Sequence, residues 1–156
     1  MWKVSGRDNT IAELGKIKHG CEPRDIGDGG PVTQAKFDYP VGVATDKNGN
    51  VYITDYHHHV VRKVSSSDNT ITTIAGTGGS EGYSGDERPA TQAQLSFPAG
   101  VTVDGHGNVY IADYHNHRIR KVSAVNNTIT TIAGTGHAGY NSGRNTRRPS
   151  AIVVSF

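Results

Sequence analysis

The chain alternates between short runs of branched or aromatic residues and short polar segments rich in glycine and asparagine. Valine, isoleucine, tyrosine and threonine dominate these runs, and such side chains favour a pleated sheet. The pattern predicts strands near residues 41–46, 50–55, 60–65 and 70–75, and the same set 58 residues later. The best candidate for a helical turn is the short segment 90–95, so the sequence predicts an all-β protein.

The second set of strands repeats the first at a constant spacing. Asp113 follows Asp55, and Pro98 follows Pro40, by the same 58 residues, and about two-thirds of positions 37–78 recur unchanged in 95–136. Repetition at a fixed period indicates one structural unit used more than once. Four antiparallel strands in a unit of this length are typical of a β-propeller blade.

One stretch of the second copy carries a family resemblance. Residues 98–122, PAGVTVDGHGNVYIADYHNHRIRKV, closely resemble the NHL repeat, with Asn116-His117 at the Asn-His of the name. The first copy departs from the motif, because His58-His59 stands there. The TIAGTG segments and the GDGG or GDER loops resemble the NHL proteins with long glycine-rich connectors. The resemblance implies a propeller, typically of six blades.

The repeat also divides the chain. Residues 1–36 match the end of one repeat, 37–94 a full repeat, 95–148 a second, and 149–156 the start of a further one. This amounts to about two and a half to three blades, whereas closed propellers have about four to eight. We therefore expect a partial arc of a larger propeller, either a fragment or part of an assembly, with self-association through open edges.

Composition narrows the function classes. Among 156 residues, 34% are hydrophobic and mean hydropathy is −0.51, with no apolar run of membrane-spanning length. A net charge of +2 is too small to indicate nucleic-acid binding by itself. The single Cys21 cannot form an intrachain disulfide, and the N-terminus lacks an apolar stretch of signal-peptide length. Localisation therefore stays open, with an extracellular site as the preferred expectation.

Three consecutive histidines, His57 to His59, raise the question of a metal site. His57 and His59 recur as His115 and His117, so only His58 is new. Zinc needs converging ligands, and the amidating lyases with NHL-like propellers use histidine-bound zinc, but their ligands do not map onto this sequence. We expect hydrogen-bonding roles, no metal and no cofactor. Replacing His58 by Asn, as in the second copy, is expected to change stability by less than about 0.5 kcal/mol, as at a surface position.

Two pairs of aspartates lie next to turns. Those that end the second strand are expected to accept backbone N–H bonds of the following turn, with a catalytic carboxylate as the alternative reading. The other pair precedes glycine-containing hairpins. The residues assigned to turns are Asp46, Asp55, Asp104, Asp113, Gly49 and Gly107.

Three weaker motifs are set aside. GTGHAG at 134–139 fits G-x-G-x-x-G, but no helix follows to meet a pyrophosphate. The basic cluster at 144–149 is read as a solvated loop, because no stripe of cations and stacking aromatics accompanies it. Residues 126–128 form an N-glycosylation acceptor only if the protein is secreted.

In an up-and-down blade, the loop between strands two and three emerges at the same end as the long connectors. Longer loops with aromatic and charged residues are the better place for binding. The candidate ligand-face residues are Tyr56, His57, His58, Tyr114, His115, Asn116, Tyr83, Glu87 and Arg88. We expect a non-enzymatic scaffold for a protein or carbohydrate, without nucleic-acid or membrane binding. A metal-dependent lyase or hydrolase and an RNA-binding NHL domain are the alternatives.

Overall fold

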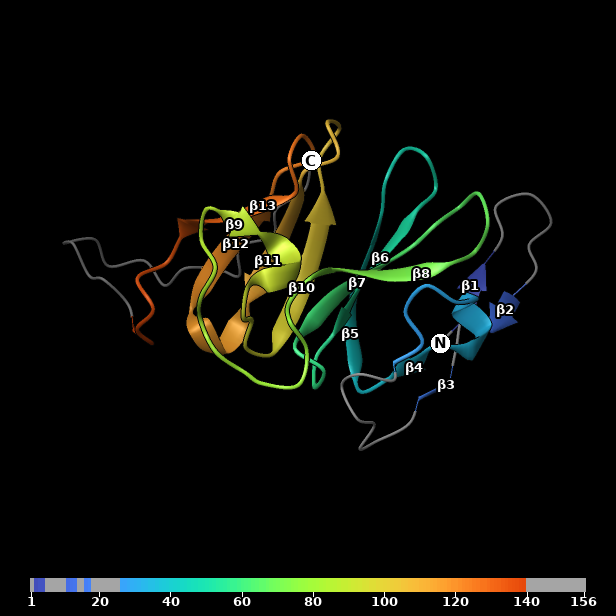
Figure 1. Cartoon of the computed structure of the whole chain (residues 1–156), viewed down its shortest axis with the longest axis horizontal. Helices are drawn as coiled ribbons and strands as arrows, with labels where there is room; N and C mark the ends of the chain where they lie inside the picture. The colour runs from blue at the N-terminus through green and yellow to red at the C-terminus, as the bar shows by residue number, and fades with distance from the viewer. Residues whose placement is uncertain (1, 5–10, 14–15, 18–25, 140–156) are drawn as a thin grey trace, which may run out of the picture.

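The computed structural model describes residues 2–4, 11–13, 16–17 and 26–139. Two antiparallel sheets of near-identical architecture lie side by side (Figure 1). The first blade consists of β5 (Pro40–Thr45), β6 (Val51–Asp55), β7 (Val60–Val64) and β8 (Ile71–Ala75). The second consists of β10 (Pro98–Val103), β11 (Val109–Asp113), β12 (Arg118–Val122) and β13 (Thr128–Ala133). The predicted all-β fold with four-stranded propeller blades is confirmed, and each strand lies within a residue or so of its expected range.

The strand register repeats together with the sequence. Val51 pairs with Val64 in the first blade, as Val109 pairs with Val122 in the second. Near the N-terminus, β1 (Trp2–Val4) pairs antiparallel with β2 (Ile11–Glu13), as expected for the last two strands of a preceding repeat. A short parallel pair joins β3 (Lys16–Ile17) to β4 (Lys36–Phe37).

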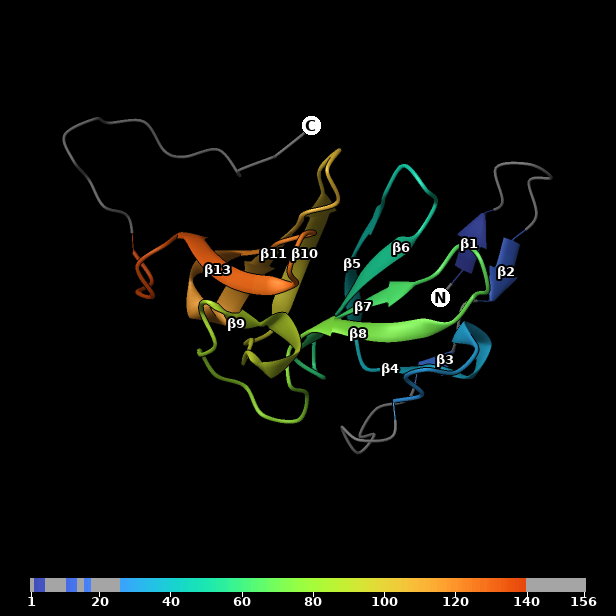
Figure 2. The same ribbon diagram turned by 45° about the horizontal axis from the view of Figure 1, so that its top comes forward.

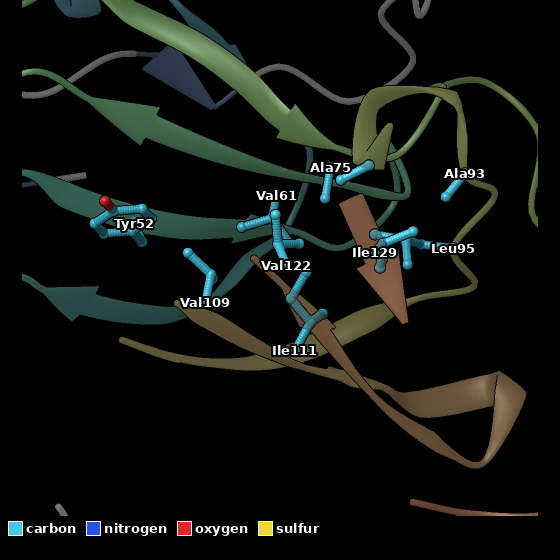
Figure 3. Packing of buried hydrophobic residues seen from close by; sticks show 10 residues of the cluster. Tyr52, Val61, Ala75, Ala93, Leu95, Val109, Ile111, Val122 and Ile129 are labelled. Atoms are coloured by element: carbon cyan, nitrogen blue, oxygen red, sulfur yellow. The ribbon is translucent and has the colours of Figure 1, made fainter. Parts of the chain in front are cut away.

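One of two hydrophobic cores lies between the blades (Figure 3). Tyr52, Val61 and Ala75 of the first blade face Val109 and Val122 of the second. Val51, Ile53 and Ile71 are also buried, but they pack in a second core with Val32, Ala35 and Phe37 of the first connector. Their counterparts Val109, Ile111 and Ile129 belong to the interface between the blades. This interface orders the two blades, because burial of apolar area is the main favourable term in folding.

The innermost strands, β5 and β10, lie side by side where the two blades meet (Figure 1). A Cβ atom at Gly42 would lie 2.6 Å from the carbonyl oxygen of Ala99. Thr54 accepts the Gly42 N–H at 2.7 Å and donates to Ala99 O at 3.3 Å. Glycine is therefore required here by the approach of the neighbouring blade.

Each long connector (residues 26–37 and 76–97) runs along the outer strand of the blade that follows it. In the second connector, β9 (Arg88–Pro89) pairs with β13 and leads into the 3₁₀ turn η2 (Ala90–Gln92) (Figure 2). The first connector repeats this arrangement, with Gly29 and Gly30 bonded to Ile71 and the 3₁₀ turn η1 (Val32–Gln34) following. The connectors cover sheet edges that would otherwise offer unpaired backbone groups.

Among the described residues, no helix has the length and apolar character needed to cross a membrane. The basic cluster at 144–149, the segment 149–156 and Cys21 lie outside the described residues.

Candidate functional site

Four short segments meet at the end of the blades where the connectors enter. The β6–β7 loop is tied to the residues before β5, since Tyr56 N–H donates to Tyr39 O at 3.3 Å and His57 N–H to Asp38 O at 3.1 Å. The second blade repeats this tie, with His115 N–H donating to Ser96 O at 3.1 Å. The histidine segments and the connectors therefore share one end of the molecule, as the sequence predicted.

Side chains from these segments form a continuous aromatic strip. Tyr56 contacts the Phe97 ring at a centroid distance of 4.9 Å, which joins the two blades. Tyr39 and Tyr114 lie at its two ends and are 57% and 58% exposed. The strip consists of Tyr39, Tyr56, His57, Phe97, Tyr114 and His115.

Two of its aromatics adopt left-handed backbone conformations. Tyr39 has φ 60° and Phe97 has φ 49°, values that bulky residues rarely adopt. The Phe97 N–H donates to His59 Nδ1 at 3.2 Å, and the His59 ring packs edge-on at 4.5 Å. The surrounding contacts thus hold Phe97 in a sparsely populated conformation, and such strain tends to be kept where it positions a functional side chain.

Two histidines provide hydrogen-bonding groups at the strip: His57, which belongs to it, and His59, which packs against Phe97. Asp38 Oδ1 lies 3.2 Å from His57 Nδ1, which keeps the proton of a neutral ring on Nδ1 and leaves Nε2 as an acceptor. His59 is mostly buried, and this burial lowers its pKa against the opposing influence of Glu81. A neutral His59 can accept the Phe97 N–H, whereas its protonated ring cannot.

Each blade contains one fully buried arginine that bonds to its connector. Arg120 donates to Asp86 Oδ1 at 2.8 Å and to Asp113 Oδ2 at 3.2 Å. In the first blade Arg62 occupies the equivalent position and donates to Asp28 Oδ1 at 2.7 Å. Each arginine therefore fixes the connector to its own blade through charged hydrogen bonds to partly exposed carboxylates.

The carboxylates that end β6 and β11 have partners other than those expected. Asp55 Oδ1 accepts the N–H of Asp38 at 2.9 Å, and Asp113 Oδ1 accepts that of Ser96 at 2.7 Å. Both partners precede the inner strand of the blade, so these carboxylates bind the incoming connector rather than the following turn. Both aspartates are buried.

His58 does not belong to the exposed face. Its side chain is 3% exposed, with Nδ1 2.9 Å from Asp55 Oδ2. Asn116 fills the same position in the second blade and donates from Nδ2 to Asp113 Oδ2 at 2.8 Å and to Gly82 O at 2.7 Å. The expectation of a surface position at His58 was wrong, because the residue turns inward toward the strand-end carboxylate.

Of the connector candidates, Tyr83 lies next to Gly82, whose carbonyl accepts the Asn116 amide of the second histidine segment. Tyr83 is stacked beneath Arg118, whose Cζ lies 3.7 Å from the ring centroid. Glu87 and Arg88 pair with the start of β13, where Glu87 N–H donates to Ile129 O at 2.8 Å. Glu87 and Arg88 are therefore away from the histidine segments, because the connector runs back along the outer strand.

The opposite end of each blade carries the hairpin turns. Asp46 Oδ1 accepts the N–H groups of Asn48 and Asn50, both at 2.9 Å, and Gly49 has φ 82°. Burial alone would raise the pKa of Asp46, but these bonds and the Asn50 amide lower it.

The second hairpin is equivalent, with Gly107 at φ 87°. The Asn108 side-chain amide is the largest of the influences that lower the pKa of Asp104 to about 2. Both aspartates therefore act within their turns, which is the role that the sequence indicated.

The family model described as NHL repeat matches residues 37–64 and 95–122, each of which begins just before the inner strand of a blade. The chain therefore contains two NHL repeats.

The known proteins that this chain resembles are considerably longer than the chain itself. NHL repeat-containing protein 2 of Homo sapiens is 32% identical over 55% of this chain and 12% of its own length. A probable peptidyl-alpha-hydroxyglycine alpha-amidating lyase of Caenorhabditis elegans is 29% identical over 76% of this chain and 30% of its own length. A structural genomics protein of unknown function from Bacteroides thetaiotaomicron superposes with a TM-score of 0.52 at 30% identity, covering 56% of this chain and 22% of its own. The chain spans less than a third of the length of the curated relatives it matches.

The zinc chemistry implied by lyases of NHL-like type does not fit the described part of this NHL chain. Within it, no three His, Cys, Asp or Glu side chains converge closely enough to hold a metal ion. His57 is directed to Asp38, and His58 to Asp55. The histidines are therefore divided among separate carboxylates.

Sequence reasoning missed Tyr39 and Phe97, although a signal existed. Each directly precedes the proline that begins the inner strand, and the two are 58 residues apart. An aromatic residue repeated before a repeated proline indicates the same role in both blades, whereas its left-handed backbone depends on contacts distant in sequence. The roles of Arg62 and Arg120 were also missed, because their connector partners are 34 residues away in sequence.

Proposed function

We propose that this NHL chain is a non-enzymatic binding scaffold whose aromatic strip contacts a protein or carbohydrate ligand. The observation that carries the proposal is the strip itself, six rings from two blades in one array with both ends exposed. Large aromatic side chains with polar tips dominate recognition surfaces, since they offer wide contact area at low entropic cost.

The residues that hold the strip in place favour a role in ligand binding over one in catalysis. Buried arginines and aspartates hold the connectors in place, and His59 holds Phe97, so the strip is preorganised for contact. Preorganisation raises affinity because little freedom is lost on binding. The strip contains no Lys or Arg, which favours this reading over RNA binding, where phosphates require cations.

The test begins with glycan and peptide arrays probed with the purified chain, followed by calorimetric titration of the ligands retained. Tyr56→Ala and His115→Ala are expected to weaken binding by about tenfold or more each. His106→Ala, on the exposed hairpin turn at the opposite end, is the control and should leave affinity unchanged. Equal affinities for all three variants would contradict the proposal.

A further inference from the structure

The strip consists of two equivalent groups, one from each blade. Tyr39, Tyr56 and His57 form the first, with ring centroids 5.3 to 5.8 Å apart. Phe97, Tyr114 and His115 form the second, with 4.3 Å from Phe97 to His115 and 5.2 Å from His115 to Tyr114. Each residue of the first group has its counterpart in the second group 58 residues later. The repeat therefore places the same subsite twice.

The two groups join without interruption. Tyr56 of the first meets Phe97 of the second at 4.9 Å, and His57 meets Phe97 edge-on at 6.1 Å. The half-buried Phe97 occupies the middle, while the more exposed Tyr39 and Tyr114 lie at the two ends. The platform is therefore elongated across the blade boundary and suits an extended ligand with a repeating unit.

The charges around the strip argue for a neutral ligand. Asp38 is in direct contact with it through His57, and Glu81 lies near its middle, where it accepts a bond from Ser96 Oγ at 3.1 Å. Arg118, which lies close to the second group in sequence, is directed onto Tyr83 and the Asn116 carbonyl instead. A carboxylate beside a binding surface repels phosphates and acidic polymers, and the six residues of the strip include no lysine or arginine.

The hydrogen-bonding groups suit hydroxyls. His57 presents Nε2 as an acceptor, and the Tyr39 and Tyr114 hydroxyls both donate and accept. A pyranose ring carries C–H bonds on its faces and hydroxyls around its edge, so it packs on aromatic rings while bonding to polar groups beside them.

We propose that the strip binds a neutral oligosaccharide that lies across both blades, with successive sugar rings on successive aromatic groups. This inference rests on the proposed function and specifies its ligand class. A single sugar contacts one aromatic group, whereas an oligosaccharide contacts both groups. The oligosaccharide binds more tightly because its second contact is intramolecular.

The experiment titrates the full chain with neutral disaccharides and hexasaccharides: cellobiose and cellohexaose, maltose and maltohexaose, chitobiose and chitohexaose, and mannobiose and mannohexaose. At least one hexasaccharide is expected to bind about tenfold or more tightly than its disaccharide. Tyr39→Ala and Tyr114→Ala each remove one end of the platform and should abolish most of this length dependence. Tyr39→Phe and Tyr114→Phe keep the rings and should retain affinity within about threefold, while Val125→Ala on the opposite turn leaves it unchanged.

Two further probes separate the ligand class from the surface: a proline-rich decapeptide and a single-stranded RNA. Absence of binding to all the hexasaccharides overturns the oligosaccharide proposal. If the peptide then binds and loses affinity in Tyr39→Ala and Tyr114→Ala, the strip remains a binding surface with a different ligand. Hexasaccharide binding that neither alanine variant weakens overturns both the ligand class and the proposed site.

Discussion

His58 and Asn116 are different side chains in one repeat position, and both face the carboxylate at the end of a second strand. Because Asn116 bonds Asp113 directly, His58→Asn is expected to retain a partner for Asp55 and to change the free energy of unfolding by less than about 1 kcal/mol. His58→Ala removes that partner and leaves a cavity, so a loss of about 1–3 kcal/mol is expected. Urea denaturation of the two variants measures the difference. Equal losses would show that the contact with Asp55 contributes nothing.

His59 gives the protein a pH-dependent contact. Burial lowers its pKa in the folded state below the ordinary value of about 6.5, so the unfolded chain binds the extra proton more readily. Stability from this group is therefore fully present above about pH 6.5 and falls as the pH drops toward the folded-state pKa. Glu81 and Asp113 oppose the shift, while His57 and His58 reinforce it.

The measurement is the amide resonance of Phe97 together with the thermal midpoint between pH 7.5 and pH 5. Both should change as His59 is protonated, because the Phe97 N–H loses its acceptor. In His59→Gln this component of the pH dependence should disappear. A Phe97 amide that is insensitive to pH in the wild-type chain would rule out the contact as a proton-sensitive one.

At the scale of elements, the connector is held to its blade chiefly by the buried arginine. Arg120→Ala would leave Asp113 buried without its charged partner, for which a loss of about 3–5 kcal/mol is expected. Arg88→Ala changes an exposed residue of the same connector and should stay within about 0.5 kcal/mol. Denaturant unfolding gives both values, and limited proteolysis should cut connector 76–97 sooner in Arg120→Ala only. Similar stabilities for the two variants would contradict this role for the arginine.

At the scale of the whole molecule, the faces between blades determine behaviour in solution. Tyr52, Val61 and Ala75 are buried against the second blade, whereas Ile119 and Ala133, at the positions of Val61 and Ala75, are more open to solvent. On the other side, Val43 is 63% exposed although its counterpart Val101 packs in the interblade core. These faces resemble halves of an interface.

We therefore expect the isolated chain to self-associate. Light scattering after size exclusion should give a mass above that of one chain, and Ile119→Lys should lower it by placing a charge on the open face. Val125→Lys adds the same charge on an opposite-end turn, at a residue that is 94% exposed, and should not change the mass. A monodisperse monomer with a sharp two-state melt would contradict the expectation.

The sequence by itself determined the strands, the repeat and the hairpin turns, because these depend on neighbouring residues. Asp46 and Gly49 act within one turn, and β6 and β11 are runs of the branched and aromatic residues that favour strands. The tertiary structure decided which polar residues are buried and which aromatics meet. Arg120 finds Asp86 from 34 residues away, and Phe97 finds His59 from 38 residues away. Burial and ring contact at such separations depend on how connectors pack against blades, which no local pattern specifies.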